Sequence, residues 1–229
     1  MAEAIEWLND GHQVQIICEA SPWMPTDGLK ADYLVRRSFS ARSGSMSMRI
    51  AVTLVANLSG DCPNLLADKR CGIYERRPLV CRIYPAEINP FTQLDPTKKA
   101  CPSEAWGAEH PLLLRNNRII SQSVEDDIKC WRDRNEHDVH VKRKVCAALN
   151  LAKASIDKEG FFVHSPPTID LLEVLSRLKD ETDAAASQTQ WLLVADRAET
   201  LERLTQAGAT AAHPRDVKAG LYEYIGLIG

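Results

Sequence analysis

Met48–Asn57, with the sequence MRIAVTLVAN, is the stretch that decides the fold class. Its apolar residues first alternate with polar ones and then run together, which is typical of a strand in a partly covered sheet. Val14–Cys18 is a second β-branched run, with Gly11 before it and Ser21-Pro22 after it. Turn residues at both ends of such a run indicate a strand. We expect these two strands to pair in a small sheet.

Helical patterns lie on both sides of these strands. Ala2–Asn9 predicts a short first helix, and Ser121–Leu151 has apolar residues at helical spacing. Thr168–Leu178 follows Pro166-Pro167 and predicts a further helix, after a short strand at Phe161–His164. We expect the helices of the second half to cover the sheet, which gives an α+β fold.

The segments between these elements suggest how the chain is divided. Pro22–Gly44 is interpreted as loop-rich, and Asp180–Gln190 is polar and Ala-rich, as expected of a linker. Trp191–Ala195 and Glu199–Gln206 then predict a strand followed by a helix. We therefore expect a main domain at residues 1–180 and a small α/β appendage at residues 190–229.

The composition excludes several classes of protein. The chain has 229 residues, 45% of them hydrophobic, and a net charge of −3, so it has no global positive field for nucleic acid. Arg36, Arg37 and Arg42 form a local basic patch without interleaved aromatic residues. No apolar run is long enough to cross a bilayer, and Met1–Asp10 lacks the features of a secretory signal. We expect a cytoplasmic protein that binds neither membrane nor nucleic acid.

Seven cysteines are many for such a chain, and four of them fall in a proline-rich lobe at residues 60–106. Prolines at this density forbid long helices, so another interaction is needed to fasten the lobe. Thiolates are preferred ligands of zinc and of iron–sulfur clusters. The candidate metal ligands are Cys62, Cys71, Cys81 and Cys101. The alternative is that these cysteines are small buried apolar residues.

Part of this lobe resembles a known family. Cys62-Pro63-Asn64-Leu65 and Cys71–Pro85, CGIYERRPLVCRIYP, are similar to the YkgJ-like cysteine-cluster family, whose motif is C-x-I-Y-x-x-R-P-x-x-C-R-x-[FY]-P. Members are described as zinc- or iron-chelating domains or as iron–sulfur proteins. The resemblance, with a later cysteine at Cys101, implies a metal cofactor but no particular reaction.

The sequence departs from that family pattern at one point. Family members carry a C-x2-C-x3-C-C cluster ahead of this motif, whereas only Cys18 precedes Cys62 here. One interpretation is that the chain begins downstream of its true start, in which case the zinc or iron–sulfur cluster would be absent from it. The other is that four ligands suffice.

Several other residues are weaker candidates. Arg77 and Arg82 are expected near the sulfurs, where cations stabilise a negatively charged metal centre. The alternative is surface pairing with Glu75, Asp68 or Glu87. His110 could replace one cysteine, and Cys18 could approach the site from its strand. Cys130 and Cys146 lie in a predicted helix and are interpreted as structural.

Three classes of function remain open. The chain could be a metal-binding protein that supports redox or group-transfer chemistry through zinc or an iron–sulfur cluster. It could be a zinc-fastened module that binds a protein partner without catalysis, or a thiol redox sensor. No nucleophile motif or acid–base pair is recognisable, so the sequence leaves open whether the protein is an enzyme.

Overall fold

The computed structural model describes residues 1–58, 60–116, 118–181 and 189–227. The chain forms two compact units, one of Met1–Gly60 with Asp138–Gly229 and the other of Asp61–His137. The first unit holds a curled mixed sheet with helices, which confirms the α+β fold class. The second unit holds all four candidate metal ligands.

The sheet is built on the two strands that the apolar patterns predict. β1 (Val14–Ser21) pairs antiparallel with β3 (Met46–Ala56) along its whole length, from Val14 opposite Ala56 to Ser21 opposite Arg49. The other edge of β1 pairs with two strands in turn. β7 (Gly160–His164) runs antiparallel to its first half, and β6 (Lys153–Ile156) runs parallel to its end.

Shorter strands extend this sheet and make it curl. β2 (Ser38–Ser43) pairs with β3, β10 (Tyr222–Gly226) pairs with β7, and β8 (Leu192–Val194) and β9 (Ala211–Ala212) follow β6 in parallel. The end of β2 returns to the start of β8, because Trp191 N donates to the Arg42 carbonyl at 2.9 Å. The end of β2 therefore lies beside the start of β8.

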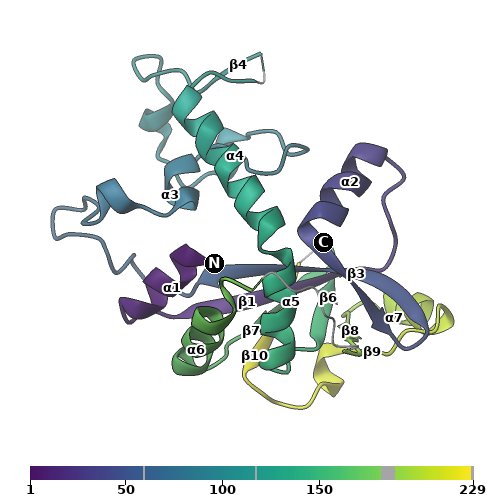
Figure 1. Ribbon diagram of the computed structural model, residues 1–229. Coiled ribbons are helices and arrows are strands. Elements are labelled where there is room, and N and C mark those ends of the chain that lie inside the picture. The colour runs from purple at the N-terminus through teal and green to yellow at the C-terminus, as the bar shows by residue number, and fades with distance from the viewer. Residues whose placement is uncertain (59, 117, 182–188, 228–229) are drawn as a thin grey trace. The chain divides into compact units, whose positions relative to one another are not determined.

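Helices cover the sheet in the same unit. α1 (Ala2–Asn9), α5 (Val139–Ala148) and α6 (Thr168–Leu178) lie together beside the strands (Figure 1). Their apolar faces share one core with β1 and β3, and α7 (Ala198–Gln206) adds Leu204 to it. The buried core includes Leu8, Ile16, Ile50, Val141, Val145, Leu171, Leu175 and Leu193.

The compact units differ from the division expected from the sequence at residues 1–180 and 190–229. β8, β9 and β10 are strands of the main sheet, although they lie in the segment expected to form an appendage. Hydrogen bonding to distant strands places them there, and local periodicity carries no information on such pairing. Most of the expected linker, residues 182–188, lies outside the described residues.

Pro22–Gly44 contains two elements where the sequence predicted loops. α2 (Gly28–Arg37) begins at Asp27, whose carboxylate accepts from the amide of Leu29 at 2.9 Å, and β2 follows directly. No residue of α2 is buried. Because α2 buries no residue, it has no strong apolar stripe, and this explains why the apolar pattern did not indicate it.

The second unit consists of short elements and one long helix. It holds α3 (Leu79–Ile83), α4 (Gln122–His137) and the two-residue strands β4 (Leu114–Arg115) and β5 (Arg118–Ile119). Three single turns of 3₁₀ helix lie at Tyr74–Arg76, Pro96–Lys98 and Ser103–Trp106. The helical pattern of Ser121–Leu151 thus divides at Asp138 into α4 and α5, which belong to different units.

None of the helices in the described ranges is both long enough and apolar enough to cross a membrane.

Candidate metal centre

Cys62 and Cys71 lie on one tight hairpin loop. The Cys62 carbonyl accepts from the amide of Leu65 at 2.9 Å, and Leu65 forms a single antiparallel bridge pair with Cys71. The amide of Gly72 donates to the Asn64 carbonyl at 2.7 Å and closes the hairpin. Backbone hydrogen bonds therefore hold these two cysteines in one local structure.

The hairpin turns tightly at residues 68–70 and packs closely at Gly72. Lys69 has a φ of 66° at the turn, and the guanidinium of Arg70 pairs with Asp68 at 2.5 Å. Arg70 lowers the pKa of the Asp68 carboxyl through this contact and through its own backbone amide. A Cβ at Gly72 would lie 3.2 Å from the Asn64 carbonyl oxygen, so a small residue after Cys71 suits the closely packed strands.

Cys81 lies on the solvent side of α3. Leu79 and Ile83 are buried on the opposite side of this helix, four residues apart, whereas Cys81 is exposed. Residues four apart share one face of a helix. The packing that buries Leu79 and Ile83 therefore directs the Cys81 side chain away from the small core.

The chain before Cys101 is tied to the chain after α3. The Tyr84 hydroxyl accepts from the amide of Ala100 at 2.8 Å. The Lys99 ammonium pairs with Glu87 at 2.6 Å, and both side chains are largely buried. These two contacts hold the segment that carries Cys101 next to the segment that follows Cys81.

The apolar core of this unit is small. It consists of Leu79, Ile83, Ala86 and Ile128, with partly buried side chains such as Trp131 packed around it. α3 and α4 meet there, and the guanidinium of Arg82 on α3 pairs with Asp127 on α4 at 2.5 Å. Because little apolar surface is buried, packing alone gives this unit limited stability.

The structure gives both predicted arginines defined partners. The carboxylate paired with Arg82 is Asp127, which is buried, and not Glu75, Asp68 or Glu87. The Arg77 guanidinium lies 3.7 Å from the ring centroid of Tyr74, and its Nε donates to the Tyr74 carbonyl at 3.1 Å. Their role beside a metal stays a prediction.

The four sulfurs are not gathered into a metal site. Over residues 1–58, 60–116, 118–181 and 189–227, no three His, Cys, Asp or Glu side chains are grouped so that they could hold a metal ion. Cys62 and Cys81 are exposed, and Cys71 and Cys101 are half-buried. The thiols fit zinc or iron by their chemistry, and the four-cysteine assignment remains a prediction. His110 is exposed and lies 3.8 Å from the Glu109 carboxylate.

The other three cysteines have structural positions. Cys18 on β1 and Cys146 on α5 are buried in the large core, outside the unit that holds the candidate ligands. The hydrogen bond with Cys146 and burial hold the pKa of the Cys18 thiol well above its usual range, which keeps it protonated. Cys130 packs against the small core.

Asp127 and Tyr84 make contacts in this unit that the sequence did not suggest. Asp127 lies in a charged stretch of α4, far along the chain from Arg82, and no local pattern marks it as the buried partner of an arginine. The hydroxyl contact of Tyr84 depends on a loop that returns from residue 100. Both contacts follow from tertiary structure.

Comparison with known proteins identifies the segment that carries the cysteines. No curated protein and no solved structure matches the chain. A family model, in contrast, matches residues 30–102. This segment contains Cys62, Cys71, Cys81 and Cys101 and no other cysteine. The recognition of a cysteine-cluster family from Cys71–Pro85 is confirmed, because residues 30–102 match the family CxxCxxCC, described as a putative zinc- or iron-chelating domain.

Proposed function

We propose that the protein binds zinc or an iron–sulfur cluster through Cys62, Cys71, Cys81 and Cys101. The observation that carries the proposal is that all four thiols belong to one compact unit with only a small apolar core. The family match to a zinc- or iron-chelating domain covers all four positions and supports it. Metal binding would then supply the stability that apolar packing does not.

The energetics favour coupling between metal binding and ordering of this lobe. Cys62 and Cys71 share a hairpin, and Cys81 and Cys101 are joined through the contacts of Tyr84 and its neighbours. Bringing the two pairs together closes one loop instead of three, so the entropic cost is limited. Because the metal binds the ordered lobe, its binding free energy becomes folding free energy of residues 60–106.

The arginines suit the charge of such a centre. Four thiolates around zinc, or around an iron–sulfur cluster, carry a net negative charge, which nearby cations stabilise. Arg77 lies between Cys71 and Cys81 in sequence, and among the described residues its guanidinium contacts Tyr74 rather than a carboxylate. Bound zinc would supply a structural cross-link, and a bound iron–sulfur cluster would supply electron transfer.

Metal analysis of anaerobically purified protein tests the proposal. We expect stoichiometric metal in the unaltered chain and in Cys130→Ser, which removes a thiol of the same unit outside the proposed set. Cys62→Ser, Cys71→Ser, Cys81→Ser and Cys101→Ser should each lose most of the metal, because each removes one of four ligands. Equal metal content in all five variants would contradict the assignment.

The same preparations distinguish the metals and the alternative function. A brown protein with bound iron and sulfide indicates a cluster. A colourless protein with bound zinc indicates a structural site. A metal-free protein whose four thiols form disulfides reversibly would overturn the proposal in favour of a redox sensor.

A further inference from the structure

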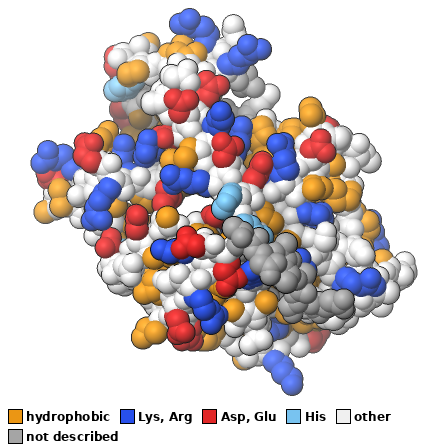
Figure 2. Space-filling view, viewed as in Figure 1, with side chains coloured by type: hydrophobic (Ala, Val, Ile, Leu, Met, Phe, Trp, Pro, Cys, Tyr) orange, Lys and Arg blue, Asp and Glu red, His pale blue; other side chains and the backbone are white. Residues whose placement is uncertain are grey.

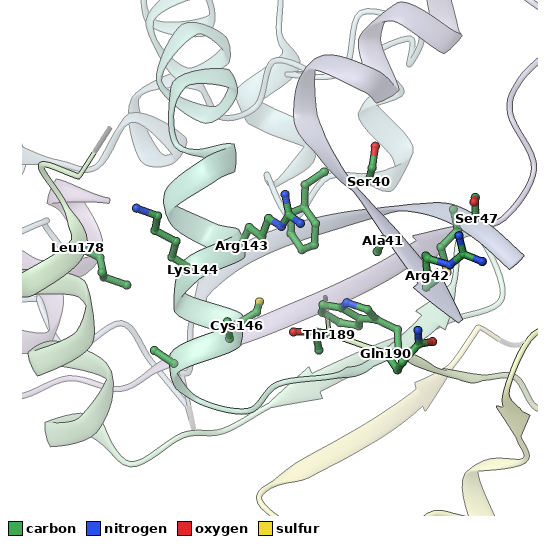
Figure 3. Close-up of a pocket in the computed structure, with 15 residues that line it drawn as sticks. Ser40, Ala41, Arg42, Ser47, Arg143, Lys144, Cys146, Leu178, Thr189 and Gln190 are labelled. Atoms are coloured by element: carbon green, nitrogen blue, oxygen red, sulfur yellow. The ribbon is translucent and has the colours of Figure 1, made fainter. Parts of the chain in front are cut away.

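A pocket lies in the unit that does not hold the candidate metal ligands. It has a volume of about 670 Å³ and is lined by β2, the start of β3, the second half of α5, Leu178 at the end of α6 and residues 189–191. Figure 3 shows Arg143, Lys144 and Cys146 on α5, with Ser40 and Ala41 on β2 across from them. A cavity of this volume is in the range of small-molecule sites.

One wall of the pocket is apolar and aromatic. Phe39, Met48 and Trp191 line it and are almost completely buried. The rings of Phe39 and Trp191 lie 6.0 Å apart between centroids and are tilted by 52°. The edges of these side chains, with the half-buried Ala41 and Ala147 beside them, offer van der Waals contact to a small apolar group.

Positive charge surrounds this apolar wall. Arg42, Arg143 and Lys144 line the pocket, and no Asp or Glu is among its described lining residues. Lys144 pairs with Glu181 at 2.5 Å, whereas Arg42 donates to the Ser45 carbonyl and the Arg143 guanidinium lies 5.9 Å from the Phe39 ring. The two guanidiniums are therefore available for an anion, and their planar fork suits a carboxylate or a phosphate.

The surface charge elsewhere is mixed. Figure 2 shows lysine, arginine, aspartate and glutamate side chains interspersed over the face in view, without one large basic area. The pocket differs from this pattern, because aromatic residues and arginines line it together without an acidic residue among its described lining. It indicates a compact ligand with an apolar part and an anionic part, and not an extended polyanion such as nucleic acid.

We propose that this pocket binds a small organic anion. Its apolar body lies against Phe39 and Trp191, and its carboxylate or phosphate is held by Arg143 and Arg42. The site is independent of the proposed metal centre, because the described residues that line it all lie outside Asp61–His137. The protein would then carry a ligand site in one unit and a metal site in the other.

Binding of the fluorescent aromatic anion 8-anilinonaphthalene-1-sulfonate (ANS) tests this proposal. We expect one saturable site whose ANS is displaced by 2-naphthoate or by 2-naphthyl phosphate, and not by the neutral 2-naphthalenemethanol at equal concentration. The two anions distinguish a carboxylate site from a phosphate site. Inorganic phosphate alone should displace ANS poorly, because it lacks the apolar body.

Substitutions in the pocket complete the test. Arg143→Gln and Arg42→Gln should each weaken ANS binding about tenfold, since each removes a charged donor. Arg215→Gln, an exposed arginine that does not line the pocket, is the matched control. Ala148→Phe fills part of the pocket and keeps Arg42, Arg143 and Lys144, so it should also weaken ANS binding. This variant provides the test if an arginine variant does not fold.

Three outcomes would overturn the proposal. They are the absence of saturable ANS binding, equal competition by the neutral alcohol, and an affinity in Arg143→Gln or Ala148→Phe equal to that of Arg215→Gln. A chelator should leave ANS binding unchanged, so failure of the metal proposal and failure of this one are distinguishable.

Discussion

At the scale of single residues, Arg49 shows how one side chain fixes an element that the apolar pattern does not predict. Its guanidinium donates to the Val35 carbonyl at 2.8 Å, to the Ser38 carbonyl, and to the hydroxyls of Ser38 and Ser40 at 2.9 and 3.0 Å. It thereby satisfies carbonyls at the end of α2 and joins the helix to β2 and β3. Cations at a helix C-terminus also interact favourably with its dipole.

Arg49→Met should therefore destabilise the sheet unit. The substitution keeps much of the apolar stem and removes every donor, so we expect the free energy of unfolding to fall by about 1–3 kcal/mol. Arg49→Lys keeps the charge but loses the planar guanidinium fork. Its free energy of unfolding should therefore lie between that of the unaltered protein and that of Arg49→Met. Urea unfolding measures both, with Arg215→Met as an exposed control. Equal midpoints for Arg49→Met and Arg215→Met would contradict this role.

Glu19 is a second residue whose environment has a measurable consequence. Burial, and then the nearby Asp157, raise the pKa of Glu19 to about 7 from a model-peptide value of 4.5, while Arg37 opposes the shift. Between these two pH values the folded state keeps a proton that the unfolded state has released. The stability contributed by this proton is complete below about pH 4.5 and is lost as the pH rises through 7.

Glu19→Gln removes this titration. We expect the variant to gain stability relative to the unaltered protein as the pH rises from 4.5 to 7, by on the order of 2 kcal/mol. Urea midpoints at several pH values in that window measure the difference. Glu6→Gln, at an exposed position on α1, is the control. A pH slope in Glu19→Gln equal to that of Glu6→Gln would exclude a raised pKa for Glu19.

At the scale of elements, the sequence predicts those that bury an apolar stripe in one core. Ala2–Asn9 and Thr168–Leu178 have the predicted bounds as α1 and α6, and the two early strands pair as expected. α2 was missed because it buries no residue. The helical pattern of Ser121–Leu151 continues across Asp138, although α4 and α5 contribute to different cores. Periodicity reports that a face is apolar, not which core it joins.

α3 offers a direct test of the small core. Ile83 is 1% exposed and Val80 is 53% exposed on the same short helix. Ile83→Ala should cost about 2–4 kcal/mol, a large part of the stability of residues 61–137, whereas Val80→Ala should cost less than about 0.5 kcal/mol. Hydrogen exchange should show faster exchange across α3 and α4 only in Ile83→Ala. Similar exchange in the two variants would mean that α3 does not anchor this unit.

At the scale of the whole molecule, long-range contacts account for what the sequence could not predict. β8, β9 and β10 join the main sheet through pairings with strands far along the chain, and Arg82 meets Asp127 across the second unit. The cysteine motif could be recognised because its residues are close in sequence. The arrangement of the pocket could not, since Phe39, Arg143 and Trp191 come from three separated segments.

The division into two units predicts how the proposed metal acts on stability. If four thiolates bind it, Cys71→Ser or Cys81→Ser should speed amide exchange throughout Cys62–Cys101, because the binding free energy that orders this lobe is lost. α6 should keep its protection, since Leu171 and Leu175 are buried in the core of the other unit. Cys130→Ser controls for loss of a thiol beside the small core. Unchanged exchange across Cys62–Cys101 in both ligand variants would show that no metal fastens the lobe. If exchange became faster in α6 together with Cys62–Cys101, the two units would not unfold independently.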